Sequence, residues 1–498
     1  MSFERKFTKG VAWMSAGGWV EQAINFAILA VLARLLGVET FGILAMAAAL
    51  VLLVEFLVRE SVSEILLTQD TLSPQRLNSV FWLLVAFGAG LAGLLFIASN
   101  PIATFYGEAQ VAPLIVALSP TVPMIALAAV PVALLRREMR FRALALRAVC
   151  GVIAGGVVGI GMALSGFGVW SLAGQRVTQV GVNAIMAWAA VSWRPGLSVS
   201  FTHIGEVLHF GHRIIGLRAA ELVAVQMPSV IIGATLGPIQ AGLFSIAWRA
   251  VEIASFLVTT PLRMVAHPAL SQVMRDGANA TALLLDIMRI TGLVAFPAFA
   301  GLALLSEPAL TVLFGQKWAA AAPVLSILSV FGLYLCIEKV QQTYCLAAGR
   351  VGILALLAWC EVGLSITLIY LTVPFGLPAV TAGFVVAFLV LWPLRFRNLA
   401  AIANLKAGTL MRLHIAPFFL AAIMAAGVYL VSHQLAETSG LIVLVTGTLS
   451  GLVLFAGLAF FFLRDRLEVL RSFIRQKVPA SKPRYTTLLE TRGEKDSN

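Results

Sequence analysis

Long apolar runs separated by short polar turns form the dominant pattern along the 498-residue chain. A helix needs about 20 apolar residues to cross a hydrocarbon core ~30 Å thick, because each residue advances it by about 1.5 Å. The pattern therefore predicts an all-α, polytopic membrane protein with about fourteen transmembrane helices. We expect them at 11–34, 41–65, 78–98, 111–135, 143–163, 168–191, 211–235, 240–262, 288–305, 320–337, 352–372, 376–394, 414–432 and 440–463.

Prolines interrupt one of these runs, at 111–135, where Pro113, Pro120, Pro123 and Pro131 occur. Proline removes a backbone donor, but neighbouring helices in a membrane bundle re-satisfy the freed carbonyl groups. We therefore expect kinks within this span rather than a loop.

The composition supports the same class of protein, with 60% hydrophobic and 12% charged residues. Soluble proteins carry about 25% charged residues, so a soluble enzyme is excluded. The net charge of +12 would indicate nucleic-acid binding in a soluble protein, which makes the position of the cations decisive.

Most of the cations lie in turns on one side of the predicted membrane. Twenty-eight of the 35, among them Arg289, Lys339 and Arg395, fall in turns on the side of the N-terminus or in the C-terminal tail, against Arg34 and Lys317 on the opposite side. Because Lys and Arg mark cytoplasmic turns, both termini are expected in the cytoplasm. The charge is thus a topology signal, and no nucleic-acid partner is expected. Five arginines fall within spans: Arg59, Arg147, Arg176, Arg218 and Arg249.

Two stretches 200 residues apart resemble each other, 36–42 (Leu-Gly-Val-Glu-Thr-Phe-Gly) and 236–242 (Leu-Gly-Pro-Ile-Gln-Ala-Gly), and the same offset carries Glu21 onto Glu221. An even number of helices in each copy predicts a parallel repeat about an axis along the membrane normal. We therefore expect two six-helix bundles and two additional C-terminal helices. The expected boundaries are a bundle at 1–195, a cytoplasmic linker at 196–210, a second bundle at 211–400, helices thirteen and fourteen within 401–463, and a basic, partly disordered cytoplasmic tail at 464–498.

Charged side chains within the spans are the candidates for function, because a charge at the bilayer centre costs at least ~2.5–3.5 kcal/mol and normally faces a bundle interior or water. Three pairs have helical spacing and can neutralise each other: Glu55 with Arg59, Arg218 with Glu221, and Arg249 with Glu252. The same groups can instead line a cavity between the bundles, where a guanidinium holds phosphate bidentately. Both interpretations stay open.

The candidate cavity residues are Arg59, Arg176, Arg218, Arg249, Glu21, Glu221 and Glu252. Glu361 stands alone in the middle of its helix and is either structural or an ion-coupling group. No cofactor or metal is expected, since the cysteines and histidines lack the spacing of ligand motifs. The acidic residues of the predicted external turns are scattered over four turns and no nucleotide-binding or nucleophile motif occurs, which favours a transporter over an enzyme.

Four short stretches resemble the turns of a known family. They are Ala-Arg-Leu-Leu-Gly at 33–37 followed by Phe41-Gly42, the basic turn at 136–142, Gly-Phe-Gly-Val-Trp-Ser-Leu at 166–172, and Phe-Gly-Gln-Lys-Trp at 314–318. Together they resemble bacterial polysaccharide flippases, from the superfamily that also holds multidrug and toxin extrusion transporters and the lipid II flippase.

The resemblance implies two bundles in a V around a central cavity, in the bacterial cytoplasmic membrane. It implies alternating access and transfer of undecaprenyl-diphosphate-linked oligosaccharides for exopolysaccharide, capsule or lipopolysaccharide assembly. The implied partners are that lipid-linked oligosaccharide, membrane lipids, and a polymerase and chain-length protein, with the transporter itself a monomer. A cation-coupled multidrug exporter of the same fold and a membrane glycan polymerase or ligase are the alternatives, although the latter needs a larger external loop than this chain has.

Overall fold

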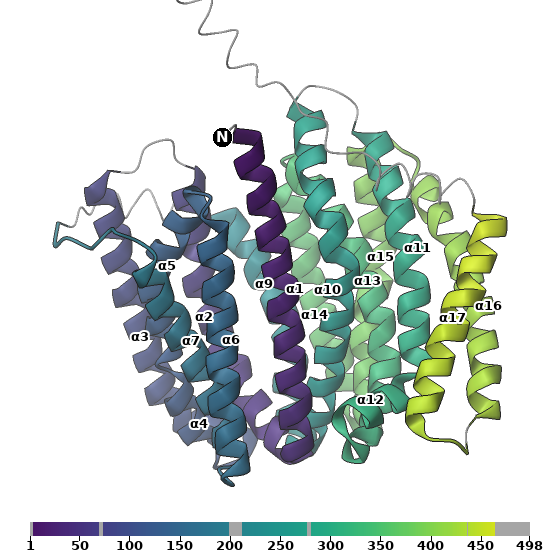
Figure 1. Ribbon diagram of the computed structural model, residues 1–498, viewed down its shortest axis with the longest axis horizontal. Helices are drawn as coiled ribbons and strands as arrows, with labels where there is room; N and C mark the ends of the chain where they lie inside the picture. The colour runs from purple at the N-terminus through teal and green to yellow at the C-terminus, as the bar shows by residue number, and fades with distance from the viewer. Residues whose placement is uncertain (1–2, 69–72, 199–211, 276–279, 436, 464–498) are drawn as a thin grey trace, which may run out of the picture.

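The computed structural model describes residues 3–68, 73–198, 212–275, 280–435 and 437–463 (Figure 1). In these ranges all regular structure is helical, as the sequence predicts. The first helices are α1 (Phe3–Leu35), α2 (Val38–Thr68), α3 (Pro74–Tyr106), α4 (Val111–Leu118), α5 (Thr121–Arg137), α6 (Phe141–Leu164) and α7 (Trp170–Ala189). The others are α9 (His212–Leu236), α10 (Pro238–Arg275), α11 (Thr281–Leu304), α12 (Ser306–Phe314), η1 (Gln316–Ala321), α13 (Ala322–Ala347), α14 (Val351–Thr372), η2 (Val373–Phe375), α15 (Leu377–Ile402), α16 (Ala407–Gln434) and α17 (Gly440–Phe462).

Thirteen segments of the described chain are long and apolar enough to cross a membrane. Helix α7 is not among them, although its 20 residues are long enough. Its polar residues Gln175, Arg176, Gln179 and Asn183 lower its hydropathy. The polytopic all-α fold is therefore confirmed, whereas the count of fourteen spans depends on α7 and stays a prediction.

Several helices extend beyond the expected spans, such as α10, which continues from the expected end at residue 262 to Arg275, and two differences have a clear physical reason. The run at 111–135 is divided into α4 and α5 at Ser119 and Pro120, where the backbone keeps helical angles, so the chain bends without forming a loop. Helix α13 continues ten residues beyond the predicted end at residue 337, to Ala347. A hydropathy criterion stops at the charged residues Glu338 and Lys339, but the helix continues because these charges find partners on neighbouring helices.

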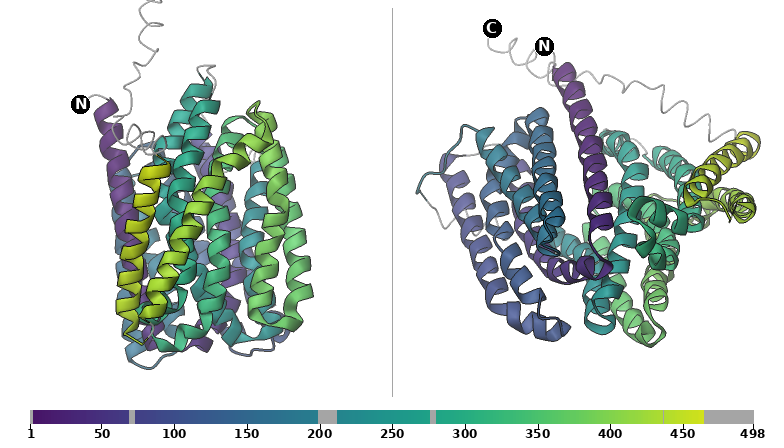
Figure 2. Two further views of the ribbon diagram at one scale, coloured as in Figure 1. Left: turned by 90° about the vertical axis from the view of Figure 1, so that its right-hand side faces the viewer. Right: turned by 60° about the horizontal axis from the view of Figure 1, so that its bottom comes forward.

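The helices form two groups (Figures 1 and 2). In the N-terminal group, α1–α7, helix α6 packs on α1 and α7, and α5 packs on α2, α3 and α7. In the C-terminal group, α9–α17, helix α13 packs on α10, α11 and α15, while α14 packs on α9 and α15. Helices α16 and α17 pair with each other at the edge of this group (Figure 2). Residues 199–210 of the predicted linker 196–210, and the tail 464–498, lie outside the described residues.

The two groups meet where α2 packs against α9 and α10. A Cβ atom on Gly42 would lie 1.7 Å from the carbonyl oxygen of Pro238, and a Cβ atom on Gly242 would lie 2.2 Å from that of Val38. Small residues allow membrane helices to approach this closely. These contacts lie at the end of the molecule where α1 ends and α2 begins, which we call the junction end.

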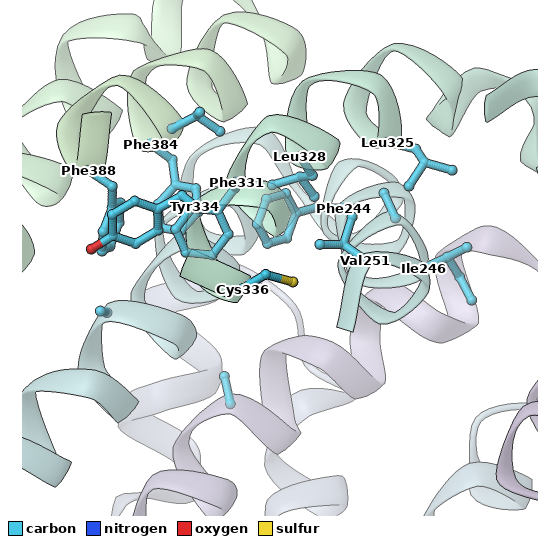
Figure 3. Packing of buried hydrophobic residues seen from close by; sticks show 14 of the residues in the cluster. Phe244, Ile246, Val251, Leu325, Leu328, Phe331, Tyr334, Cys336, Phe384 and Phe388 are labelled. Carbon is cyan, nitrogen blue, oxygen red and sulfur yellow. The ribbon is translucent and has the colours of Figure 1, made fainter. Parts of the chain in front are cut away.

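Aromatic side chains stiffen the core of the C-terminal group (Figure 3). The Phe331 ring of α13 lies 4.7 Å from Phe384 and 4.9 Å from Phe388 of α15, measured between centroids. Tyr334, one turn further along α13, stacks on Phe331 and also contacts Phe388. This layer fixes the relative position of α13 and α15, and therefore of the charged side chains that follow it on both helices.

Candidate functional site

A buried carboxylate connects three helices of the N-terminal group. Glu55 of α2 is 2% exposed. Its Oε1 accepts a hydrogen bond from Thr121 Oγ1 of α5 at 2.6 Å, and its Oε2 accepts one from Arg176 Nη2 of α7. The structure thus pairs Glu55 with Arg176 of another helix, and the predicted pairing of Glu55 with Arg59 stays a prediction. The packing of α7 and α5 beside α2 brings Arg176 to the carboxylate, whereas the Arg59 side chain is exposed.

Glu21 of α1 is half-buried and interacts electrostatically with Arg147 of α6. Helices α1 and α6 are in tight contact here, since a Cβ atom on Gly17 would lie 2.5 Å from the Cβ of Ala145. Arg147 also interacts electrostatically with Arg59 and with Arg136 at the end of α5. Arg147 is one of the five arginines expected within spans, and this position is the sequence signal for it, although it is not among the candidate cavity residues.

In the C-terminal group the predicted pair of Arg218 and Glu221 on α9 forms, with Arg218 Nη1 donating to Glu221 Oε2 at 3.0 Å. Glu221 Oε1 also accepts a hydrogen bond from Gln342 Nε2 of α13, and Lys339 Nζ lies 4.0 Å from the same oxygen. The carboxylate of Glu221 thus links α9 to α13.

A second cluster lies deeper in the same group, around Arg395 of α15. Its Nη2 donates to Glu361 Oε2 of α14 at 2.5 Å, and its Nη1 donates to Glu338 Oε1 of α13 at 3.3 Å. Tyr334 Oη donates to Glu361 Oε1 at 2.9 Å. All four side chains are buried.

Lys339 joins the two clusters, because its Nζ also lies 3.5 Å from Glu338 Oε2. The result is an alternating series of three cations and three carboxylates across four helices, which we call the C-terminal charge network: Arg218, Glu221, Lys339, Glu338, Arg395 and Glu361. Its formal charges cancel, as buried charges require.

The structure corrects three expectations about charged residues. Arg395 and Lys339 were assigned to cytoplasmic turns, but both lie within helices and form ion pairs there. Arg289, assigned in the same way, lies in α11 and pairs with Asp286 at 2.8 Å. Glu361 does not stand alone, since both its oxygens accept hydrogen bonds from Arg395. An ionised carboxylate within an apolar helix is costly without a cation, and its position there was the signal for a partner on another helix.

The third predicted pair also forms, on α10. Arg249 Nη1 donates to Glu252 Oε2 at 2.7 Å. The two side chains are 54% and 51% exposed, far more than the members of the C-terminal charge network. Glu21 and Glu221, which occupy equivalent positions of the predicted repeat, each interact with charges of their own group.

Comparison with known proteins gives matches over most of the chain. Residues 31–323 match the family model described as polysaccharide biosynthesis protein. The chain is 30% identical over 323 residues to the succinoglycan biosynthesis transport protein ExoT of Rhizobium meliloti, and this alignment covers 65% of each chain. It is 23% identical to the lipopolysaccharide biosynthesis protein WzxC of Escherichia coli, over 71% of this chain and 72% of that one.

Among solved structures, the lipid II flippase MurJ in an inward closed conformation superposes with a TM-score of 0.74 at 14% identity, over 91% of this chain and 99% of MurJ. This likeness concerns the fold. Because the family model matches more than half of the sequence, and the helices have the length and apolarity of membrane spans, this chain is a multi-pass membrane protein that belongs to the polysaccharide biosynthesis protein family.

Proposed function

We propose that this protein is a flippase that moves undecaprenyl-diphosphate-linked oligosaccharide repeat units across the bacterial cytoplasmic membrane by alternating access. The units would serve exopolysaccharide, capsule or lipopolysaccharide assembly. Membership of the family supports this proposal, as do the transport function in the name of ExoT and the flippase-like fold.

The observation that carries the proposal is the exposed ion pair of Arg249 and Glu252 within a membrane-spanning helix. A charge in such a helix is too costly to face lipid, so it faces water or protein, and half-exposed side chains imply water. A guanidinium holds a phosphate group bidentately, through two parallel hydrogen bonds. An arriving diphosphate therefore competes with Glu252 for Arg249, while Glu252 keeps the site neutral between cargo molecules.

Candidates from both groups occur at a similar depth. At about 1.5 Å per residue, Glu21, Glu221 and Arg249 lie roughly 15–25 Å from the junction end of their helices. That depth is near the middle of a ~30 Å hydrocarbon core. We propose that the polar head group of the cargo passes at this level, with Arg59, Arg176 and Arg218 as further cationic contacts, while the prenyl chain stays in lipid.

The proposal includes an orientation and a division of the chain. Both termini are cytoplasmic, the junction end faces outward, and residues 1–195 and 211–400 form two bundles that move relative to each other. Helices α16 and α17 accompany the second bundle, against which they pack. A polymerase and a chain-length protein are the proposed downstream partners of a monomeric transporter.

The test is polymer production in cells that lack the native gene. We expect Arg249→Ala and Arg218→Ala to abolish export and to leave lipid-linked repeat units on the cytoplasmic side, with normal amounts of the variants in the membrane. Arg249→Lys keeps the charge without the planar guanidinium and should retain partial export. Normal export by both alanine variants would refute the assignment of these residues. Intact polymer production in cells without the protein, together with loss of drug resistance, would instead indicate a multidrug exporter.

A further inference from the structure

A second set of contacts between the two groups lies at the junction end, between the end of α1 and the short α12–η1 segment. Trp318 Nε1 of η1 donates to the carbonyl oxygen of Ala33 at 2.9 Å. Lys317 Nζ donates to the carbonyl oxygens of Arg34, at 2.9 Å, and of Leu36. All three acceptors belong to the last turn of α1 or follow it directly, because α1 ends at Leu35.

The contact is reciprocal. Arg34 Nε donates to the carbonyl oxygen of Leu313 at 3.1 Å, and Arg34 Nη2 donates to that of Val312. Both acceptors lie in the last turn of α12, which ends at Phe314. The final carbonyl groups of a helix have no partner within it and carry partial negative charge. Each group therefore supplies a cation that caps the end of a helix in the other group.

Apolar packing positions these cations. The Trp318 side chain is fully buried, and its ring meets Phe41 of α2 edge-on at 5.3 Å between centroids. Phe314 contacts Phe26 of α1 in the same manner at 6.0 Å. Gly315 between them has a φ of 102°, a conformation open to glycine, and this turn directs Lys317 and Trp318 toward α1.

The acceptors in this contact are neutral. Among the described residues, neither Arg34 nor Lys317 is within ion-pair distance of a carboxylate. When the groups separate, water can replace these neutral carbonyl acceptors at little net cost, so the hydrogen bonds can be broken and re-formed. Arg395, held between two buried carboxylates, shows the opposite arrangement.

We propose that Arg34, Lys317 and Trp318 form a reversible latch that holds the two groups together at the junction end. Cargo leaves the protein on that side only after the latch has opened. Arg34 and Lys317 are also the two cations that the charge pattern assigns to turns on the predicted external side. The latch explains why cations occur there. The latch concerns the contact between the groups and requires no particular cargo, whereas the exit of cargo on that side rests on the proposed function.

The test measures the distance between the two groups at the junction end, by electron spin resonance in proteoliposomes without cargo. Spin labels are attached at Gln110→Cys beside α4 and at Phe375→Cys in η2, both exposed positions, after the accessible Cys150 and Cys360 have been replaced by alanine. We expect a single short distance in the parent protein. In Arg34→Ala with Lys317→Ala, a longer distance should appear, and the ratio of open to closed protein should rise about tenfold.

Two controls separate the position of the cations from their charge. Lys406→Ala removes a cation at the opposite end of the molecule, before α16, and should leave the distances unchanged. Arg34→Lys with Lys317→Arg keeps both cations and should stay mostly closed. An unchanged distance in the double alanine variant would overturn the latch. If that variant does not reach the membrane, Lys317→Gln alone supplies the comparison with a smaller shift. Because no cargo is present, the result is independent of whether the flippase assignment is correct.

Discussion

Arg395 illustrates how a bundle of apolar helices accommodates a buried charge. Its guanidinium lies between Glu361 and Glu338, and Tyr334 supplies a further donor to Glu361. Removing an ion from water costs several kcal/mol, which is offset only when its partners are in place. The members of this cluster therefore depend on one another.

We expect Arg395→Leu to destabilise the protein by about 3–5 kcal/mol, because Glu361 would be left buried without its cation and Glu338 would keep only Lys339. Thermal unfolding in detergent measures the effect as a lower Tm. The double variant Arg395→Leu with Glu361→Leu removes both charges of the closest pair and should recover much of the loss. An equal Tm for the parent and Arg395→Leu would contradict the role of the network. Ion coupling through Glu361 stays a prediction, and these contacts already account for the residue structurally.

At the scale of elements, the closest approach of the two groups depends on glycine. The backbones of α2 and α10 touch at Gly42 and Gly242, which are equivalent positions of the predicted repeat. No side chain fits at either position without moving a backbone carbonyl group of the facing segment.

We expect Gly42→Ala to separate the helices and to lower stability by about 1–3 kcal/mol, the usual effect of overpacking. Polymer production should fall with it, because the contact holds the groups at the junction end. Gly90→Ala in α3 is the matched control, since nothing lies within 4 Å of its Cβ position. Its Tm should be unchanged or slightly higher, because alanine favours the helix. The same Tm in both variants would argue against a tight junction.

For the whole molecule, the charge asymmetry makes a topological prediction. Green fluorescent protein fused after Asn498 should fluoresce, because it folds in the cytoplasm. Alkaline phosphatase fused after Glu108 or Glu437, in predicted external turns, should be active. The reverse pattern of activities would overturn the orientation and would place the junction end on the cytoplasmic side.

Hydropathy predicted the helices well, and it failed where a helix carries its own charges. It ended the tenth span before Glu338, although α13 continues to Ala347, and it placed Arg395 in a turn. Both errors have one cause. The hydropathy of a stretch of sequence counts every charged residue as unpaired, whereas a charge that forms an ion pair with another helix costs less to bury. Helix α7 is the opposite case, because its polar residues lower its mean hydropathy and α7 is not among the thirteen candidate spans.

The sequence alone therefore predicted the features that depend on residues close together in the chain. The membrane class, the positions of most helices, and the pairs Arg218–Glu221 and Arg249–Glu252 depend on hydrophobicity and on the period of one helix. Only the tertiary structure assigned Arg176 to Glu55, completed the C-terminal charge network, and brought Arg34 to the end of α12. Those contacts depend on which helices become neighbours, and helix neighbours are chosen by packing between segments far apart in the chain.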